Sequence, residues 1–115
     1  MDANLRQTGT ENRRRGLAKS VAVLRMEPSE LAQRFGISFE EHSDDLGALN
    51  AAVFETTGGK QFGLLRHKGC PSPGTEVLVD EKSTNPSADL NEFMTLLGIT
   101  EEDILLTAPG IIISA

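Results

Sequence analysis

The feature that most constrains the fold is a pair of apolar runs joined by two glycines, at residues 51–67, which read AAVFETTGGKQFGLLRH. The pair Gly58-Gly59 is typical of a two-residue hairpin turn, because glycine tolerates positive φ at both central positions. On either side, residues 51–56 and 61–67 alternate as a strand does, with apolar residues on both faces. We therefore expect a β-hairpin at the centre of a sheet, with at least one face covered by helices.

Shorter apolar runs predict the strands around this hairpin. Residues 21–26 and 76–81 are rich in valine and leucine, and a late strand is expected near Leu105 or Ile111. The runs near the two ends, at residues 21–26 and 111–113, are candidates for an edge strand. An edge strand pairs readily with another chain, so either run could mediate self-association or partner binding.

Two helices are expected, at residues 28–35 and 87–97. Each carries an apolar stripe at helical spacing and is followed by a glycine, Gly36 or Gly98, which suits a helix end. The sequence thus predicts an α+β fold. We expect a small, mostly antiparallel sheet of about three to five strands centred on the hairpin, with the two main helices packed on one face.

The charge distribution divides the chain into two parts. Residues 1–20 carry five Lys or Arg against two Asp or Glu, although the whole chain has a net charge of −6. Apolar periodicity is nearly absent over residues 1–19, which predicts a flexible basic arm, and residues 20–115 are expected to form a single α+β domain. The consecutive arginines Arg13, Arg14 and Arg15 are candidate nucleic-acid contacts, whereas the acidic remainder would repel nucleic acid.

One segment resembles a known family. Residues 29–38, SELAQRFGIS, resemble the first helix and turn of bacterial helix-turn-helix regulators, which implies a recognition helix directly afterwards. The next twelve residues, FEEHSDDLGALN, hold four carboxylates and no Lys or Arg. A helix that reads DNA needs donors toward bases and phosphates, so this segment is expected to be an ordinary helix ending at Gly36, followed by an acidic loop.

A polar site is expected, if anywhere, where the second hairpin strand ends. Arg66 and His67 lead directly into a proline-rich corner that contains Cys70, the only cysteine. Imidazole and thiolate suit a metal or thiol site, and His42 is the only other histidine. A closed zinc site needs four ligands, and the two histidines and one cysteine supply only three of the nitrogen and sulfur kind. We therefore expect no metal site, and we also expect no cofactor and no catalytic residues in this chain.

Composition limits the remaining function classes. Five Phe and no Trp or Tyr offer little surface for stacking bases or sugars. The single cysteine favours a reducing compartment, we expect no secretory signal, and no apolar run in the sequence is long enough to cross a membrane. A cytoplasmic location and no membrane partner are expected.

These observations favour a small acidic protein-protein interaction or regulatory module, such as an adaptor or an immunity or antitoxin-like protein, that is not an enzyme. A protein partner or self-association is expected, and the acidic body would suit a basic partner. Two alternatives stay open: a nucleic-acid-binding protein that uses the basic arm, and a small metal or thiol protein built on His67 and Cys70.

Overall fold

The structure is a computed structural model, and it describes residues 1–114 of the 115-residue chain, so Ala115 of the expected domain lies outside the described residues. Within that part, strands, two α-helices and two short 3-10 turns alternate. In chain order they are β1 (Leu5–Thr8), η1 (Thr10–Asn12), β2 (Leu17–Leu24), α1 (Pro28–Phe35), β3 (Glu40–Asp44), β4 (Gly47–Thr56), β5 (Gln61–His67), β6 (Thr75–Asp80), α2 (Pro86–Leu97), η2 (Glu101–Asp103) and β7 (Ile104–Thr107).

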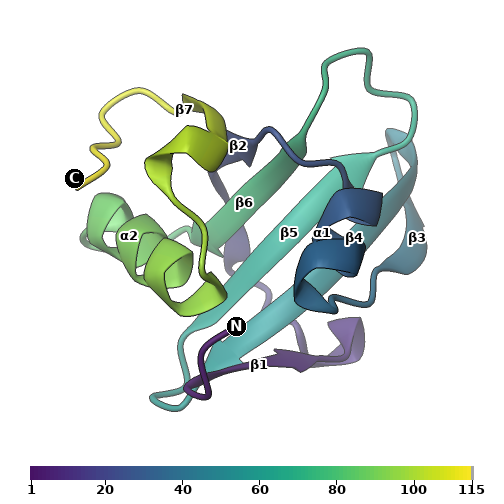
Figure 1. Ribbon diagram of the computed structural model, residues 1–115. Coiled ribbons are helices and arrows are strands. Elements are labelled where there is room, and N and C mark those ends of the chain that lie inside the picture. Colours follow the sequence, from purple (N-terminus) through teal and green to yellow (C-terminus); the bar gives the residue numbers. More distant parts are fainter. Residues whose placement is uncertain (115) are drawn as a thin grey trace.

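All strands belong to one antiparallel sheet (Figure 1). Its order is β1-β4-β5-β6-β2-β7, and β3 pairs with the part of β4 that β1 leaves free. The expected α+β class is therefore confirmed, and the predicted hairpin is β4–β5, an interior pair with β1 and β3 beside β4 and with β6 beside β5. The expected number of strands was too low, because residues 1–114 contribute seven strands to the sheet.

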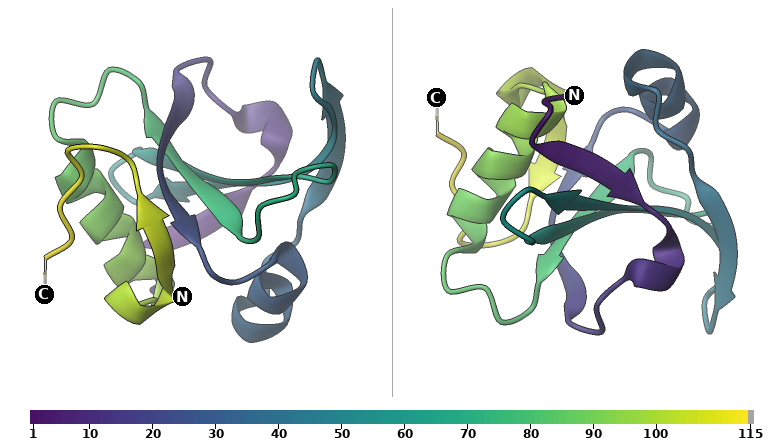
Figure 2. Two further views of the ribbon diagram at one scale, coloured as in Figure 1. Left: turned by 90° about the horizontal axis from the view of Figure 1, so that it is seen from above. Right: turned by 90° about the horizontal axis from the view of Figure 1, so that it is seen from below.

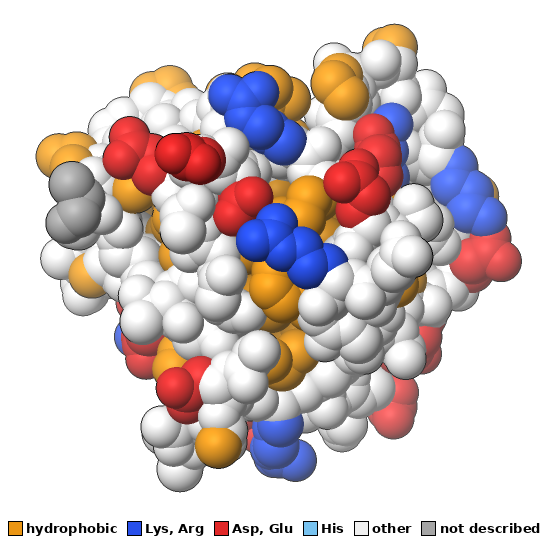
Figure 3. Space-filling view, viewed as in Figure 1, with side chains coloured by type: hydrophobic (Ala, Val, Ile, Leu, Met, Phe, Trp, Pro, Cys, Tyr) orange, Lys and Arg blue, Asp and Glu red, His pale blue; other side chains and the backbone are white. Residues whose placement is uncertain are grey.

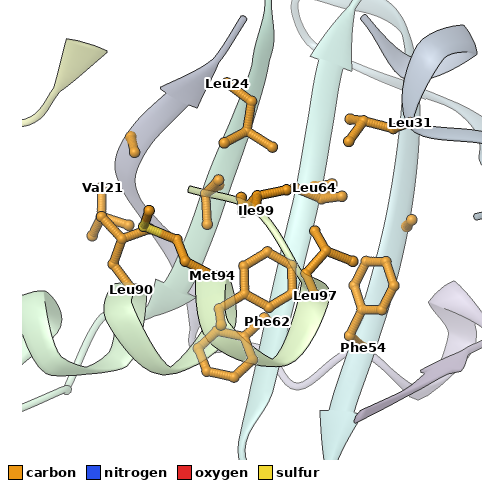
Figure 4. Packing of buried hydrophobic residues seen from close by; sticks show 14 of the residues in the cluster. Val21, Leu24, Leu31, Phe54, Phe62, Leu64, Leu90, Met94, Leu97 and Ile99 are labelled. Atoms are coloured by element: carbon orange, nitrogen blue, oxygen red, sulfur yellow. The ribbon is translucent and has the colours of Figure 1, made fainter. Parts of the chain in front are cut away.

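Both α-helices pack on the same face of this sheet (Figure 2). Leu31 of α1 and Phe93 of α2 are fully buried in one core cluster that includes Phe54 of β4 and Phe62 of β5. The Phe93 ring lies 5.5 Å from the Phe54 ring and 4.8 Å from the Phe62 ring, centroid to centroid. Figure 4 shows Phe54, Phe62 and Leu31 in this cluster. Burial of one such side chain contributes about 1.5–3 kcal/mol, so this cluster holds the helices on the sheet.

Local signals explain where the helices begin and end. Pro28 occupies the first position of α1, and Gly36 ends the helix in the left-handed region with φ +72°. At the start of α2, Asn85 Oδ1 accepts a hydrogen bond from Ala88 N at 3.1 Å. The expected bounds of α1 are confirmed, and α2 begins one residue before the expected start, at Pro86.

The central hairpin turns over more residues than the Gly-Gly pair predicts. Thr56 N donates to Lys60 O at 2.8 Å, so residues 57–59 form the loop. Only Gly59 of the pair has positive φ, at +89°. The turn is therefore a three-residue loop that needs one left-handed glycine, rather than a two-residue turn that needs two.

Residues 1–19 form part of the fold and not a separate flexible arm, which corrects the expectation from the sequence. Residues Leu5–Thr8 form β1 and pair with the end of β4, while the first residues of β2 pair with β6. The two isolated leucines anchor this segment, because Leu5 is 4% exposed and Leu17 is 1% exposed. Each leucine packs against distant residues, so the segment shows no periodicity of its own.

The helix-bearing side is not fully covered by α1 and α2. Figure 3 shows apolar side chains emerging in a strip near the middle of this side, with basic and acidic side chains around and across it. Arg34 of α1 reaches Asp103 of η2 at 3.3 Å, and its guanidinium lies 5.0 Å from the centre of the Phe35 ring. This pair links the first helix to the segment that follows the second. Neither helix in residues 1–114 is long and apolar enough to cross a membrane.

Candidate functional site: a groove on the uncovered face of the sheet

The face of the sheet that points away from the helices carries its own apolar surface. In β4, Leu49, Ala51 and Val53 alternate with the core residues, so they point to this second face. The register of the hairpin places each of them beside a residue of β5, in the pairs Leu49–His67, Ala51–Leu65 and Val53–Gly63. Leu78 of β6 continues the last of these rows. The apolar residues of these rows thus form a continuous floor across β4, β5 and β6.

Strand β3 extends this face with polar side chains. Its register pairs Glu40 with Ala51, His42 with Leu49 and Asp44 with Gly47. Glu40, His42 and Asp44 alternate along β3 and line the same hollow as the floor. One cross-strand row therefore reads His42, Leu49, His67, which brings the two histidines of the chain to the same face.

The segment between β1 and β2 closes the other side of the floor. Thr10, Glu11, Arg13 and Leu17 line it, and Figure 2 shows η1 on the side of the sheet opposite α2. The result is a groove of about 530 Å³. Gly63 lies at its base, where a Cβ would make ordinary van der Waals contacts with Leu17 Cδ2 and Leu78 Cβ at 3.4 Å. The groove is thus formed by β3 on one side and η1 with the start of β2 on the other.

A hydrogen-bond network joins these two sides of the groove. Thr10 donates to Glu40 twice, from its backbone N at 2.9 Å and from Oγ1 at 3.1 Å. His42 Nε2 lies 2.7 Å from Thr10 Oγ1, so the imidazole shares a hydrogen bond with the same hydroxyl. These bonds fix η1 against β3.

A second polar pair lies where β3 meets the end of β5. His67 Nε2 is 2.8 Å from Asp44 Oδ2, and Asp44 Oδ1 accepts from Leu46 N at 2.8 Å. The hydrogen bond from His67 lowers the pKa of the Asp44 carboxyl below its ordinary value, with the Leu46 amide acting in the same direction. Asp44 is thus held in its ionised form at the groove's edge.

The structure separates the expected polar site of Arg66, His67 and Cys70. Arg66 and His67 are consecutive in β5 and so point to opposite faces. Arg66 binds the loop after β5 by donating to Gly74 O at 2.9 Å and Cys70 O at 3.3 Å, whereas His67 contacts Asp44 in the groove. The Cys70 residue is exposed. Arg66 therefore meets the backbone of Cys70, and His67 belongs to the other face.

The three arginines expected to contact nucleic acid lie in the segment between β1 and β2. Arg13 lines the groove and donates to Leu17 O at 3.1 Å. Arg14 donates to Gly59 O at 2.5 Å and pairs with Glu55 at 3.1 Å, while Arg15 is exposed. Two of the three guanidinium groups are thus engaged in contacts that hold this segment to the sheet.

The groove combines residues that the sequence patterns do not connect. The expected acidic loop at residues 40–45 is largely strand β3. The sequence signal that could have indicated this strand is Gly47, which has φ +110° at the turn into β4.

In residues 1–114, no group of three or more His, Cys, Asp or Glu is arranged to hold a metal ion. Comparison of the chain with protein-family models, with curated proteins and with solved structures finds no match.

Proposed function

We propose that this protein is a small cytoplasmic interaction or regulatory module, without a catalytic role, that binds a protein partner in the groove on the uncovered face of its sheet. The observation that carries the proposal is the groove itself, which has an apolar floor built on adjacent strands and polar side chains along both sides. Fitting a partner over such a floor removes apolar surface from water and is favourable by about 25 cal/mol per Å².

The composition of the groove supports a protein interface. Ala51, Leu65 and Leu78 are only half-buried, so apolar surface on the floor remains open to a partner. The side chains around it are hydroxyl, carboxylate, imidazole and guanidinium groups. An apolar centre surrounded by polar groups that can hydrogen-bond is the usual anatomy of a protein interface.

The groove is also held in shape before any partner arrives. Its floor is part of a hydrogen-bonded sheet, and the bonds from Thr10 to Glu40 tie its two sides together. A preformed surface loses less conformational entropy when it binds. This favours binding as the role of the groove over a role in folding alone.

A selection from a random peptide library displayed on phage tests the proposal directly. The purified chain is the bait, and dissociation constants of the enriched peptides are then measured by fluorescence anisotropy. Ala51→Phe fills the groove from its floor. Ser29→Phe places the same side chain at an exposed position of α1, on the opposite side of the sheet. Circular dichroism and urea unfolding verify that both variants fold.

The proposal expects peptides whose affinity falls at least about tenfold in Ala51→Phe and stays within about twofold in Ser29→Phe, because a blocked central pocket removes most of the binding energy. Enriched peptides that bind Ala51→Phe as tightly as the wild type would contradict the proposal. A selection that enriches no peptide would contradict it as well.

A further inference from the structure

The charged groups around the groove are unequal in sign. The carboxylates of Glu11, Glu40 and Asp44 line it, against the single guanidinium of Arg13. Arg13 is itself turned to the backbone, since its Nη2 donates to Leu17 O at 3.1 Å. The net charge of the whole chain is −6, so the rest of the molecule adds to the negative potential and does not cancel it.

Two carboxylates of the groove, those of Glu40 and Glu11, are not paired with a Lys or Arg of residues 1–114. Both oxygens of Glu40 accept from Thr10, through its amide and its hydroxyl. Each carboxylate oxygen has two lone pairs, so Glu40 can accept a further hydrogen bond from a partner.

This acidic margin lies directly beside the apolar floor. Glu40 pairs across the strands with Ala51, and Ala51 with Leu65, so one row runs from a carboxylate to the half-buried floor. A side chain with a long apolar stem and a cationic head matches such a row, because its stem covers the floor while its head meets the carboxylate. Lysine and arginine have this form.

We infer, resting on the proposed function, that the partner contributes a segment in which a Lys or Arg stands between bulky apolar residues. Its apolar side chains cover Ala51 and Leu65, and its cation pairs with Glu40 and Glu11. A segment with Asp or Glu at the same place is disfavoured, since its carboxylate meets those of Glu40 and Glu11, which pair with no Lys or Arg of residues 1–114.

Synthetic peptides test this inference. The probe is a capped seven-residue peptide with lysine between two leucines and Gly and Ser at the remaining positions. Three versions replace the lysine by glutamine, the lysine by glutamate, or both leucines by serine. Dissociation constants come from the shifts of backbone amide signals of ¹⁵N-labelled protein, followed at Ala51 and Leu65, at low and at high salt.

The lysine peptide should bind about three to five times more tightly than the glutamine version, the range expected of a partly exposed ion pair. The glutamate and serine versions should bind more weakly still. Glu11→Gln should remove about the same factor without affecting folding, since Glu11 is exposed. Glu30→Gln makes the same change at an exposed position of α1 and should leave the peptide affinity unchanged.

Equal binding of the lysine and glutamine peptides, or an unchanged affinity in Glu11→Gln, would overturn the inference. Phage peptides that depend on the groove but lack a basic residue would also overturn it, while leaving the proposed function intact. If no peptide of either experiment binds in the groove, the proposed function fails together with the inference.

Discussion

Arg66 Nε lies 3.0 Å from Glu27 Oε2, and this pair holds both polar groups of one glycine in the loop between β5 and β6. Glu27 Oε1 accepts from Gly74 N at 3.2 Å, while Arg66 Nη1 donates to Gly74 O at 2.9 Å. Glu27 is the residue just before α1, so the pair joins that helix to the loop and to β5. The corner that the sequence marked as a candidate site is thus an anchor for the loop.

Replacing the arginine of this pair should loosen the loop. Arg66→Lys keeps the charge but loses the planar fork that reaches several carbonyls at once, which should lower the free energy of unfolding by about 1–2 kcal/mol. Urea unfolding measures that loss, and trypsin should cleave faster after Lys68 in the loosened loop. Arg15→Lys, at an exposed position, is the control. Unchanged unfolding and cleavage in Arg66→Lys would show that the loop does not depend on this pair.

The glycine held by the pair should tolerate no side chain. Gly74 has φ +102°, and a Cβ there would lie 2.2 Å from Leu24 O. Gly74→Ala should therefore cost more than about 2 kcal/mol of unfolding free energy, through backbone strain and the collision with β2. Gly69→Ala in the same loop meets nothing within 4 Å and should stay within about 0.5 kcal/mol of the wild type. Equal urea midpoints for the two variants would be incompatible with this geometry.

The elements predicted well are those whose signals lie within the element. α1 has Pro28 at its first position and Gly36 at its end, and the alternation of β5 ends where the loop begins, so the bounds of both follow from a few adjacent residues. β1 has no such signal. Its residues Leu5–Thr8 become a strand only because β4 offers an edge to pair with, at Val53 to Thr56, far along the chain. A single sequence carries no pattern for such a distant pairing.

The groove could not be predicted for a related reason. Strand β3 is polar on both faces, so its alternation is invisible to a pattern that contrasts apolar with polar residues. His42 and His67 share a row only through the registers of β3 with β4 and of β4 with β5. The short spacing of His67 and Cys70 in the sequence suggested a site that would include Arg66. Strand alternation instead sends His67 to the groove face and Arg66 to the opposite face, so the expected residues do not converge.

Lys60 should give the protein a specific loss of stability at alkaline pH. Its Nζ lies 2.8 Å from both Asp89 Oδ1 and Glu92 Oε1, and these hydrogen bonds, that of Asp89 first, raise its pKa. Because the pKa of Lys60 is raised in the folded state, its ion pairs contribute fully to the free energy of unfolding below the unfolded pKa of about 10.4. That contribution is lost as pH rises through the folded pKa.

Lys60→Gln should thus be less stable than the wild type by about 0.5–1 kcal/mol at pH 9, a modest value because the lysine is half exposed. The difference in urea unfolding should shrink above about pH 10.4. Lys82→Gln changes an exposed lysine in the loop after β6 and controls for the general titration of lysines. A difference that stays constant from pH 9 to pH 11.5 would count against the role of the ion pairs.

Asp44 should act at the acid end of the range. The pKa of Asp44 is lowered in the folded state, chiefly by the hydrogen bond from His67. Its ionised carboxylate therefore stabilises the fold above the unfolded pKa of about 3.9, and this stabilisation is lost as pH falls through the folded pKa. In His67→Ala the pKa of Asp44, followed by NMR of its side-chain carbonyl, should rise toward about 3.9. His42→Ala should leave the titration of Asp44 unchanged. An Asp44 titration that His67→Ala does not move would show that the pair is not formed in solution.

Asn91 should control the order of residues 111–114. This residue of α2 holds residues 111–114 at two points. Its Nδ2 donates to Ile112 O and its Oδ1 accepts from Ser114 N, both at 3.0 Å. Asn91→Ala removes both bonds and should lower the unfolding free energy by about 1 kcal/mol while speeding hydrogen exchange at the Ser114 amide. Asn91→Asp keeps the acceptor but loses the donor, so Ser114 should stay protected although the bond to Ile112 O is gone. Thr95→Ala, one turn along the exposed side of the helix, is the control. Exchange at Ser114 that is equally fast in the wild type and in Asn91→Ala would mean that this segment is not held by the helix.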